Sequence, residues 1–389
     1  MKVAVVSEFY PRAHDPVLGI WAHRQALAAR DAGAEVRVLV LHRPVPPRAT
    51  RRRDAPRALA TLLFQPRHAT LDGLPVDYVP FLAPPRPRSY GAWGAWAAPS
   101  LAVALRRLRR RFPFDLVHAH NAVPAGDAVL HGRISAPLVV SVHGGDVYYT
   151  AVRHPAGERA VRRTLSAARL VLANSAGIER DARGLGAART RVVRLGADLA
   201  EQPARKAPAP TLVTVGHLVA RKRHADVVRA LWLLRDRHPD LRYLVIGDGP
   251  ERVPLARLAA ELGVPDRVDL VGQLPHAQAL ERAREAHVFV MPSVDEAFGV
   301  AYVEAMAAGL PAVGARGEAG PQEIAAAGDG LRLVAPGDVE ALAAELDALL
   351  AEPDYLQEVG AQARATVARA FTWEACGRAT VAAYEDALR

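Results

Sequence analysis

The sequence predicts an α/β protein with two doubly wound, Rossmann-like domains. An apolar strand at 3–6, a helix at 20–32 and a second apolar strand at 35–41 follow one another with the spacing of a βαβ unit, which implies a parallel sheet. A Pro/Ala-rich segment at 201–210 then interrupts the chain, and a new series of strands and helices begins at 211. With 389 residues, the chain is long enough for two domains of roughly 150 residues or more each.

We therefore expect an N-terminal domain at 1–200, a second domain at 207–370, and a closing helix at 371–389 that crosses back to the first domain. The first domain is expected to add strands at 75–79, 115–118, 137–141 and 169–173 and a helix at 101–112, with an otherwise irregular region at 42–100. The second is expected to contain strands at 211–215, 242–246, 268–271 and 287–291, and helices at 225–237, 253–262, 277–286 and 300–308. Ligands of such folds bind beyond the carboxyl ends of the strands, so we expect the site in a cleft between the domains.

Charge is unevenly distributed. Residues 1–206 hold 32 Lys and Arg against 15 Asp and Glu, whereas residues 207–389 hold 18 against 26. A basic first half indicates an anionic substrate or surface near it. The arginines are not interleaved with aromatic residues as in nucleic-acid-binding modules, so nucleic acid is not an expected partner.

The cysteine content and the lengths of the apolar segments limit where the protein is expected to be located. The single cysteine, Cys376, excludes an intramolecular disulfide and a thiolate zinc site. The apolar run at the start of the chain is too short for a signal peptide, and no stretch is long enough to span a membrane. We expect a cytoplasmic protein that is soluble or peripheral on the inner face of the membrane.

The strongest chemical signal lies between Pro292 and Pro311. Glu296 follows an apolar strand, Gly299 permits a tight turn into a helix, and Glu304 lies just over one turn inside that helix. A helix N-terminus offers unpaired N–H groups and a positive dipole end to a phosphate. Carboxylates beside it can accept hydrogen bonds from sugar or ribose hydroxyls. Phosphate and polyol together describe a nucleotide-sugar.

On these residues the chain resembles the retaining, metal-independent glycosyltransferases of the GT-B fold with an E-x7-E signature, a group-1 type also called glycosyltransferase family four. Other motifs follow in the family's order. They are Gly19 in the first βα turn, the segment from Ser141 to Asp146 around His143, Gly216 to Lys222, the turn from Gly247 to Pro250, Val271 to Leu274, and the C-terminal segment from Phe371 to Tyr384.

The resemblance implies a role for each matching residue. Glu296 would bind hydroxyls of the transferred sugar, and Glu304 those of the ribose. Lys222 would neutralise the leaving diphosphate, and His143 would lie over the donor sugar from the opposite domain. The other donor-binding residues would be Gly19, Gly216, His217, Arg221, Val271, Gly272, Ala297, Phe298, Gly299 and Val300. Glu296, Lys222 and His143 would be the catalytic residues, with no cofactor and no metal. Retention would proceed by a front-face mechanism in which the leaving phosphate helps to deprotonate the acceptor.

One position departs from the family pattern. His217 stands where an arginine is usual, and a histidine is mostly neutral near pH 7. Either Arg221 supplies the second cation, or the phosphates depend on Lys222 and backbone amides. His118 and His120 could form a metal pair, but no acidic or thiol partner is evident in the sequence.

Arg106, Arg107, Arg109, Arg110 and Arg111 form a basic cluster at the end of the helix at 101–112. A solvated helix face explains it, and so does a contact with an anionic membrane through the apolar anchors Leu101, Val103, Leu105 and Leu108.

A glycosyltransferase with a nucleotide-sugar donor and a lipid-linked or polysaccharide acceptor of the bacterial envelope is thus the predicted function. An epimerase or phosphorylase of the same fold and a non-catalytic nucleotide-sugar-binding protein remain alternatives.

Overall fold

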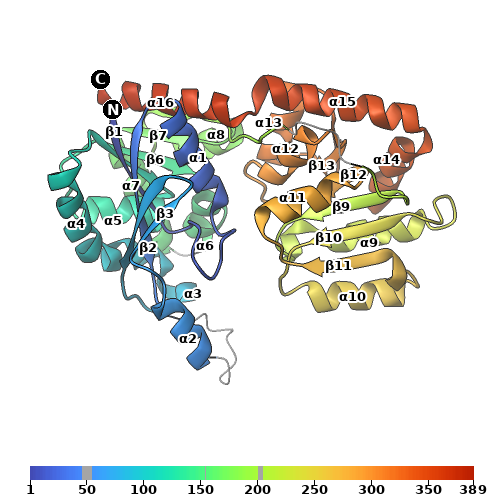
Figure 1. Cartoon of the computed structure of the whole chain (residues 1–389), viewed down its shortest axis with the longest axis horizontal. Helices are drawn as coiled ribbons and strands as arrows, with labels where there is room; N and C mark the ends of the chain where they lie inside the picture. Colours follow the sequence, from blue (N-terminus) through green and yellow to red (C-terminus); the bar gives the residue numbers. More distant parts are fainter. Residues whose placement is uncertain (46–54, 154, 200–204) are drawn as a thin grey trace. The chain divides into compact units, whose positions relative to one another are not determined.

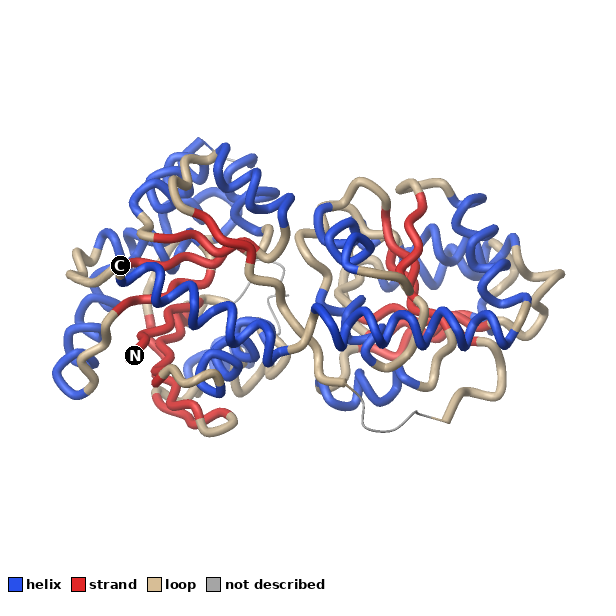
Figure 2. The backbone as a smooth tube through the Cα atoms, turned by 90° about the horizontal axis from the view of Figure 1, so that it is seen from above, coloured by secondary structure: helices blue, strands red, loops and turns tan. Residues whose placement is uncertain are grey.

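The computed structural model describes residues 1–45, 55–153, 155–199 and 205–389 (Figure 1). The chain divides into unit 1, residues 1–194 and 373–389, and unit 2, residues 195–372. Of the linker expected at 201–210, the structure describes 205–210. In each unit, parallel strands lie between layers of helices (Figure 2). Among the described residues, no helix combines the length and the apolar composition that a membrane crossing requires.

Unit 1 contains an eight-stranded sheet in the order β3-β4-β2-β1-β5-β6-β7-β8, in which only β3 and β4 pair antiparallel. Its strands are β1 (Lys2–Ser7), β2 (Glu35–His42), β3 (His68–Leu71), β4 (Leu74–Pro80), β5 (Leu116–His120), β6 (Leu138–Val142), β7 (Leu170–Ala173) and β8 (Thr190–Val192). The central strands are buried along nearly their whole length, because helices cover both faces of a parallel sheet.

The helices of unit 1 are α1 (Ile20–Asp31), α2 (Ala55–Leu63), α3 (Arg86–Ser89), α4 (Trp93–Arg111), α5 (Asp127–His131), α6 (Ala151–Arg153), α7 (Pro155–Ala167), α8 (Ala176–Gly184) and α16 (Trp373–Leu388). Short helical turns follow at Tyr90–Ala92, Ala122–Gly126 and Gly145–Thr150. Region 42–100, expected to be mostly irregular, thus contains α2, α3 and the start of α4.

The last helix, α16, packs on α1 within unit 1 (Figure 1). The two helices approach closely at Gly377, where a Cβ atom would lie 2.2 Å from the carbonyl oxygen of Ala28. A buried hydrogen bond joins Gln25 Nε2 to Thr380 Oγ1 at 3.2 Å. Cys376 is buried beside this contact, and burial raises the pKa of its thiol to about 12.

Unit 2 contains six parallel strands in the order β11-β10-β9-β12-β13-β14. They are β9 (Thr211–Val215), β10 (Arg242–Ile246), β11 (Val268–Gly272), β12 (Val288–Met291), β13 (Ala312–Ala315) and β14 (Leu331–Val334). The helices are α9 (His224–Leu233), α10 (Arg252–Glu261), α11 (His276–Arg284), α12 (Val300–Ala307), α13 (Ala319–Ala327), α14 (Val339–Ala351) and α15 (Pro353–Ala370), with short turns at Ala220–Lys222 and Pro265–Arg267.

The strand order of unit 2 reverses at β9, which lies between β10 and β12. Chain connections leave a central strand in opposite directions at such a point, and a crevice opens beyond the carboxyl ends of the two strands. The loops that follow β9 and β12 carry Gly216 to Lys222 and Pro292 to Gly299, respectively. The topology therefore brings these two predicted motifs together.

Candidate active site

Lys222 and Glu296 form a buried ion pair, with 2.6 Å between Lys222 Nζ and Glu296 Oε2. The same carboxylate oxygen accepts a hydrogen bond from Ser293 Oγ at 2.9 Å. Lys222 ends the short helical turn after β9, while Glu296 lies in the loop between β12 and α12. The pair therefore joins two loops 74 residues apart in the chain, and both residues come from the predicted set.

Burial shifts the pKa of both members of this pair. It lowers the pKa of Lys222, because the charged ammonium loses solvation, although Glu296 opposes the change. Burial alone would raise the pKa of Glu296, but the positive charges of Lys222 and Arg221 lower it below its usual value. Glu296 is thus ionised at neutral pH.

Arg221 is the second cation at this carboxylate. Its Nη1 lies 3.6 Å from Glu296 Oε2, and its side chain remains about one-third exposed. His217 is exposed, and its Nδ1 contacts the carbonyl oxygen of Asp248 at 3.4 Å. Two cations, Lys222 and Arg221, thus face one carboxylate, which leaves a net positive charge beside the loop.

Gly299 begins α12 in a left-handed conformation, with φ of 86° and no side chain capping the helix. A Cβ atom here would lie 2.4 Å from Tyr302 Cδ2, so glycine is needed for both the conformation and the space. The N–H groups of Val300 and Ala301 have no acceptor within the helix, whereas that of Tyr302 donates to the Gly299 carbonyl at 2.9 Å. Ala297 and Phe298 are buried, and the ring of Phe298 packs edge-on against Phe371 at 5.9 Å. The buried side chains therefore fix the turn that leads into α12.

Glu304 lies on α12, where its Oε1 is 2.8 Å from Nε2 of His276 at the start of α11. Val271 and Gly272 end β11, and Gly272 accepts a hydrogen bond from the N–H of Gly247 at 2.9 Å. This contact ties the end of β11 to the turn after β10. Gly216, on the other side, lies next to Lys222, whose Cε would be in ordinary van der Waals contact, at 3.8 Å, with an added Cβ.

Sequence reasoning missed the residues that hold the Glu296 loop in place. The carboxylate of Glu318 accepts the N–H of Glu296 at 2.9 Å, and the N–H of Gly320 donates to the Glu296 carbonyl at the same distance. A Cβ atom on Gly320 would lie only 2.2 Å from the carbonyl oxygen of Phe298. The Gly-Pro pair at 320–321, at the start of α13, was the available sequence signal.

In unit 1, Gly19 begins α1 in a left-handed conformation, and a Cβ atom on it would lie 2.1 Å from the carbonyl oxygen of Phe9. Gly19 therefore opens α1 in the same left-handed conformation in which Gly299 opens α12, but here it is the backbone of Phe9 that excludes a side chain.

His143 follows β6 in unit 1, and its Nε2 lies 2.9 Å from Nδ1 of His120. Burial lowers the pKa of His143 to about 4 and that of His118 to about 3, so both are neutral at pH 7. His118 bonds through its two ring nitrogens to Ser141 and Tyr384. Within the described ranges, no group of three or more His, Cys, Asp or Glu side chains is arranged to hold a metal ion. The rings thus form a neutral hydrogen-bonded cluster.

The proposed apolar anchors of the basic helix require a correction. Leu101, Leu105 and Leu108 are buried in the core of unit 1, because they form the inner face of α4. Only Val103 is exposed, at 45%, together with Trp96 at 53%.

Several arginines of this cluster bind their own unit. Arg106 donates to the Gly132 carbonyl, Arg109 donates to the Ser135 carbonyl, and Arg111 pairs with Asp77 at 2.9 Å. Arg107 and Arg110 lie exposed on the same face as Val103.

Among solved structures, the sucrose-phosphate synthase of Thermosynechococcus elongatus matches with a TM-score of 0.79 and 21% identity, over 99% of this chain and 98% of that one. The two parallel-sheet units thus form the α/β architecture called GT-B, as predicted.

Comparison of sequences identifies the family. The model of the family "Glycosyltransferase Family 4" matches residues 18–201, and that of the family "Glycosyl transferases group 1" matches residues 198–366. The 2-deoxystreptamine glucosyltransferase of Streptomyces kanamyceticus is 32% identical, over 67% of this chain and 74% of its own length. The putative teichuronic acid biosynthesis glycosyltransferase TuaC of Bacillus subtilis is 26% identical, over 80% of each chain. The chain belongs to the glycosyltransferases of family 4, group 1, and the predicted family is confirmed.

Proposed function

We propose that this glycosyltransferase transfers a sugar from a nucleotide-diphosphate donor to an acceptor hydroxyl, with retention of the anomeric configuration. The observation that carries the proposal is the gathering of Lys222, Arg221 and Glu296 beside the N-terminus of α12. This arrangement combines positive charge, unpaired backbone N–H groups and a buried carboxylate. A sugar diphosphate needs all three.

Donor binding follows from the positions of these groups. The diphosphate would contact Arg221, Lys222 and the first N–H groups of α12, and the partly exposed guanidinium of Arg221 would attract it. Glu296, held by Ser293 and by the Glu318 carboxylate on its backbone, would accept hydrogen bonds from sugar hydroxyls. Glu304 would accept hydrogen bonds from the ribose hydroxyls. Since Lys222 already pairs with Glu296, the diphosphate would share this ammonium with the carboxylate.

The transfer step needs no covalent group on the protein. The bond between the anomeric carbon and the diphosphate oxygen breaks, and a bond from the acceptor oxygen forms on the same face. The acceptor proton moves to the departing diphosphate. Lys222 and Arg221 stabilise the negative charge that develops on this leaving group, and we propose that they do so without a metal. His143 would act as a neutral hydrogen-bonding group, because its pKa of about 4 keeps it uncharged at pH 7.

We further propose that the acceptor is a lipid-linked or polysaccharide intermediate of a bacterial envelope. The putative role of the Bacillus subtilis relative in teichuronic acid biosynthesis and the basic first half of the chain support this class. A peripheral contact with an anionic membrane would use Trp96, Val103, Arg107 and Arg110 on the outer face of α4. In flotation assays, Arg107→Glu with Arg110→Glu should then reduce binding to anionic vesicles, and equal binding to neutral vesicles would contradict the contact.

The donor proposal is tested by a thermal-shift panel with UDP, GDP, ADP, dTDP and CMP and their sugar conjugates. A ligand at 100 times its Kd stabilises the protein by about 2.7 kcal/mol, which is a measurable shift. One base should stabilise the wild type more than the others, and Lys222→Ala should reduce the effect. Retention is then read from the anomeric configuration of the product. An inverted product would refute the front-face step, and no shift with any nucleotide would refute the donor site.

A further inference from the structure

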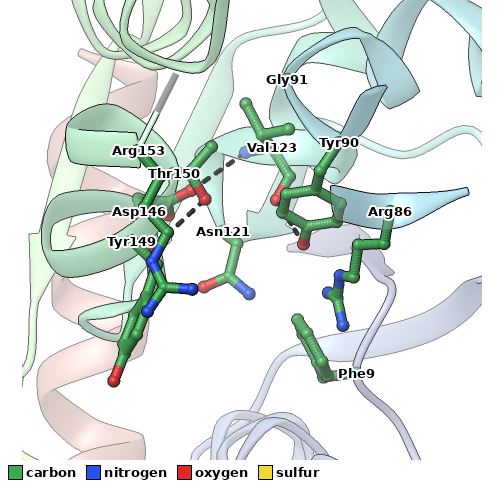
Figure 3. A pocket seen from close by; sticks show the side chains of 11 residues that line it. Phe9, Arg86, Tyr90, Gly91, Asn121, Val123, Asp146, Tyr149, Thr150 and Arg153 are labelled. Carbon is green, nitrogen blue, oxygen red and sulfur yellow. Dashed lines mark hydrogen bonds between the residues drawn. The ribbon is translucent and has the colours of Figure 1, made fainter. Parts of the chain in front are cut away.

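Unit 1 contains a cavity of about 470 Å³ that the donor site does not use. It lies beyond the carboxyl ends of β1, β5 and β6, where Phe9, Asn121 and Asp146 line it (Figure 3). The volume falls in the range of roughly 300–1,000 Å³ typical of small-molecule sites. All its lining residues belong to unit 1.

Asn121 is the first sign that this cavity is built for a ligand. Its side chain points into the cavity between Arg86 and Arg153 (Figure 3). The residue is only 6% exposed, and its Oδ1 has no hydrogen-bond partner among the described residues. Native proteins rarely leave a buried polar atom unpaired, because the loss of water is then uncompensated. A hydroxyl or ammonium donor in the cavity would satisfy this oxygen.

The backbone of Asn121 is also strained, with φ of 72° and ψ of 143°. That combination is sparsely populated by residues other than glycine, and it persists only where the surroundings impose it. In this conformation the amide of Asn121 points into the cavity (Figure 3).

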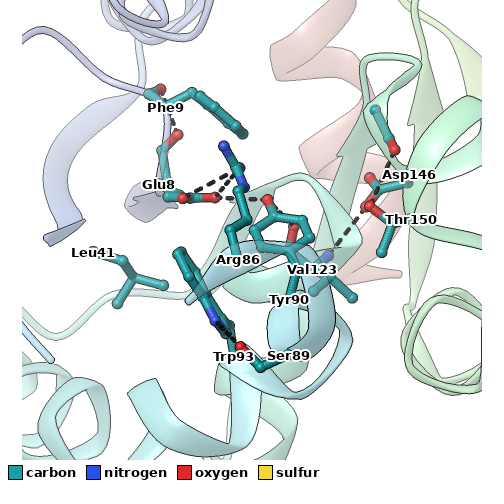
Figure 4. A network of polar contacts seen from close by, with 12 residues as sticks. Glu8, Phe9, Leu41, Arg86, Ser89, Tyr90, Trp93, Val123, Asp146 and Thr150 are labelled. Atoms are coloured by element: carbon teal, nitrogen blue, oxygen red, sulfur yellow. Dashed lines mark hydrogen bonds and ion pairs between the residues drawn. The ribbon is translucent and has the colours of Figure 1, made fainter. Parts of the chain in front are cut away.

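The charges around the cavity are unequal. Arg86 is balanced by Glu8, since Arg86 Nη2 lies 3.3 Å from Glu8 Oε2 and the Tyr90 hydroxyl donates to the same oxygen at 2.6 Å (Figure 4). Arg153 stacks over the ring of Tyr149 at 4.6 Å, and no carboxylate of the described chain pairs with it. The guanidinium of Arg153 therefore remains available to an anion.

Asp146 is bound to the backbone rather than to Arg153. Its carboxyl is buried and accepts the backbone N–H groups of Ala122 and Val123 at 2.8 and 3.2 Å. Burial raises the pKa of Asp146 to about 7, against these hydrogen bonds. Its oxygens are committed to the backbone, so the carboxyl serves to order the turn that follows Asn121.

Aromatic side chains supply the rest of the recognition surface. Phe9 and Tyr90 lie on the Arg86 side of the cavity, and Tyr149 lies beside Arg153 on the opposite side (Figure 3). Such rings pack against the apolar C–H faces of a sugar or cyclitol, while the few polar groups fix its orientation.

We propose that this cavity binds a sugar or polyol ring that carries a negatively charged group, either phosphate or carboxylate. Arg153 contacts the anionic group, and the Asn121 amide contacts a ring hydroxyl. Support for a binding site comes from the cavity alone and does not depend on the proposed function. The identification of its occupant as the acceptor of the transfer reaction rests on the proposed function.

The test is direct binding to the full chain by isothermal titration calorimetry, without nucleotide. The probes are glucose 6-phosphate, glucuronate and neutral glucose, so that phosphate, carboxylate and the bare ring are separated. We expect at least one charged sugar to bind about tenfold or more tightly than glucose, since a charge-assisted contact is added.

Substitutions test whether the probes bind at Arg153 and Asn121. Arg153→Gln should weaken the charged probe about tenfold, whereas Arg159→Gln, an exposed arginine of α7 outside the cavity, should leave it unchanged. Asn121→Ala should weaken charged and neutral probes alike. Equal affinity for glucose and the charged sugars, no binding of any probe, or full binding by Arg153→Gln would overturn the proposal.

A parallel titration with the nucleotide diphosphates separates this proposal from the donor site. Nucleotide binding without binding of a charged sugar would reject only the cavity proposal. Binding of a charged sugar without binding of any nucleotide would instead reject the proposed donor site and leave the cavity proposal standing.

Discussion

Replacing Lys222 by alanine removes the ammonium that lies 2.6 Å from Glu296 Oε2. Loss of one group that stabilises developing negative charge costs about 3–4 kcal/mol in the transition state, which corresponds to a decrease in turnover of about 100- to 1,000-fold. We expect Lys222→Ala to show this decrease in kcat with the saturating donor.

The same substitution removes one of the two cations that face the buried carboxylate of Glu296. Removing one member of a buried pair destabilises a protein by about 3–5 kcal/mol. We expect the lower end for Lys222→Ala, because Arg221 at 3.6 Å and the Ser293 hydroxyl at 2.9 Å remain. With Lys222 gone, burial raises the pKa of Glu296 and favours its protonation. The loss in free energy of unfolding should therefore be largest near pH 8 and shrink toward pH 5.

Two assays separate these effects. Initial rates at saturating donor give the loss in turnover, and urea unfolding at several pH values gives the loss in stability. Lys206→Ala is the matched control in the same unit, because Lys206 bonds only the carbonyls of Arg284 and Ala286 in the contacts described. Near-wild-type turnover by Lys222→Ala in folded protein would show that the diphosphate is not held at this lysine.

Three further predictions concern other parts of the site. Glu304→Gln should raise the donor KM more than it lowers kcat, since a ribose contact acts equally in the ground and transition states, and a pure kcat defect would argue against that contact. Gly320→Ala should weaken nucleotide binding in thermal-shift assays, because its Cβ would displace the carbonyl of Phe298 2.2 Å away. Gly184→Ala, where an added Cβ meets nothing within 4 Å, is the control. The depressed pKa of His143, about 4, means that the unfolded chain binds more protons between that value and about 6.5. Stability should therefore fall as the pH drops from 7 to 5, by about 2 kcal/mol for this residue, and His143→Gln should flatten the urea-midpoint profile. A midpoint that rose on acidification would contradict the sign.

The sequence was sufficient to predict the local elements around the donor site. β9 and β10 have the predicted bounds, and α12 begins at Val300 as expected. Each of these segments is mainly apolar and adjoins a glycine at the turn, so local pattern and tertiary fold agree.

Elements that contradict local rules were harder to predict. The helix expected from Leu101 begins eight residues earlier, at Trp93, because α4 accommodates Pro99 in its interior. Packing of Trp93 and Ala97 in the core outweighs the proline there.

Contacts between distant residues were not predictable from pattern. Nothing in the spacing indicates that Glu318 bonds the Glu296 N–H, or that Lys222 pairs with Glu296 in place of a ligand. The cavity around Asn121 is likewise assembled from separate loops. Such pairings depend on the order of strands in the sheet, which the sequence pattern leaves open.

The packing of α16 on α1 has a consequence for the order of folding. Unit 1 is encoded by two stretches of sequence, with all of unit 2 between them. During synthesis, Gln25 and His118 lie in the part of unit 1 that leaves the ribosome first, yet their buried partners Thr380 and Tyr384 are added only at the end. Unit 2 is a continuous segment and can fold while it is being synthesised. The first unit to be translated is thus the last to be completed.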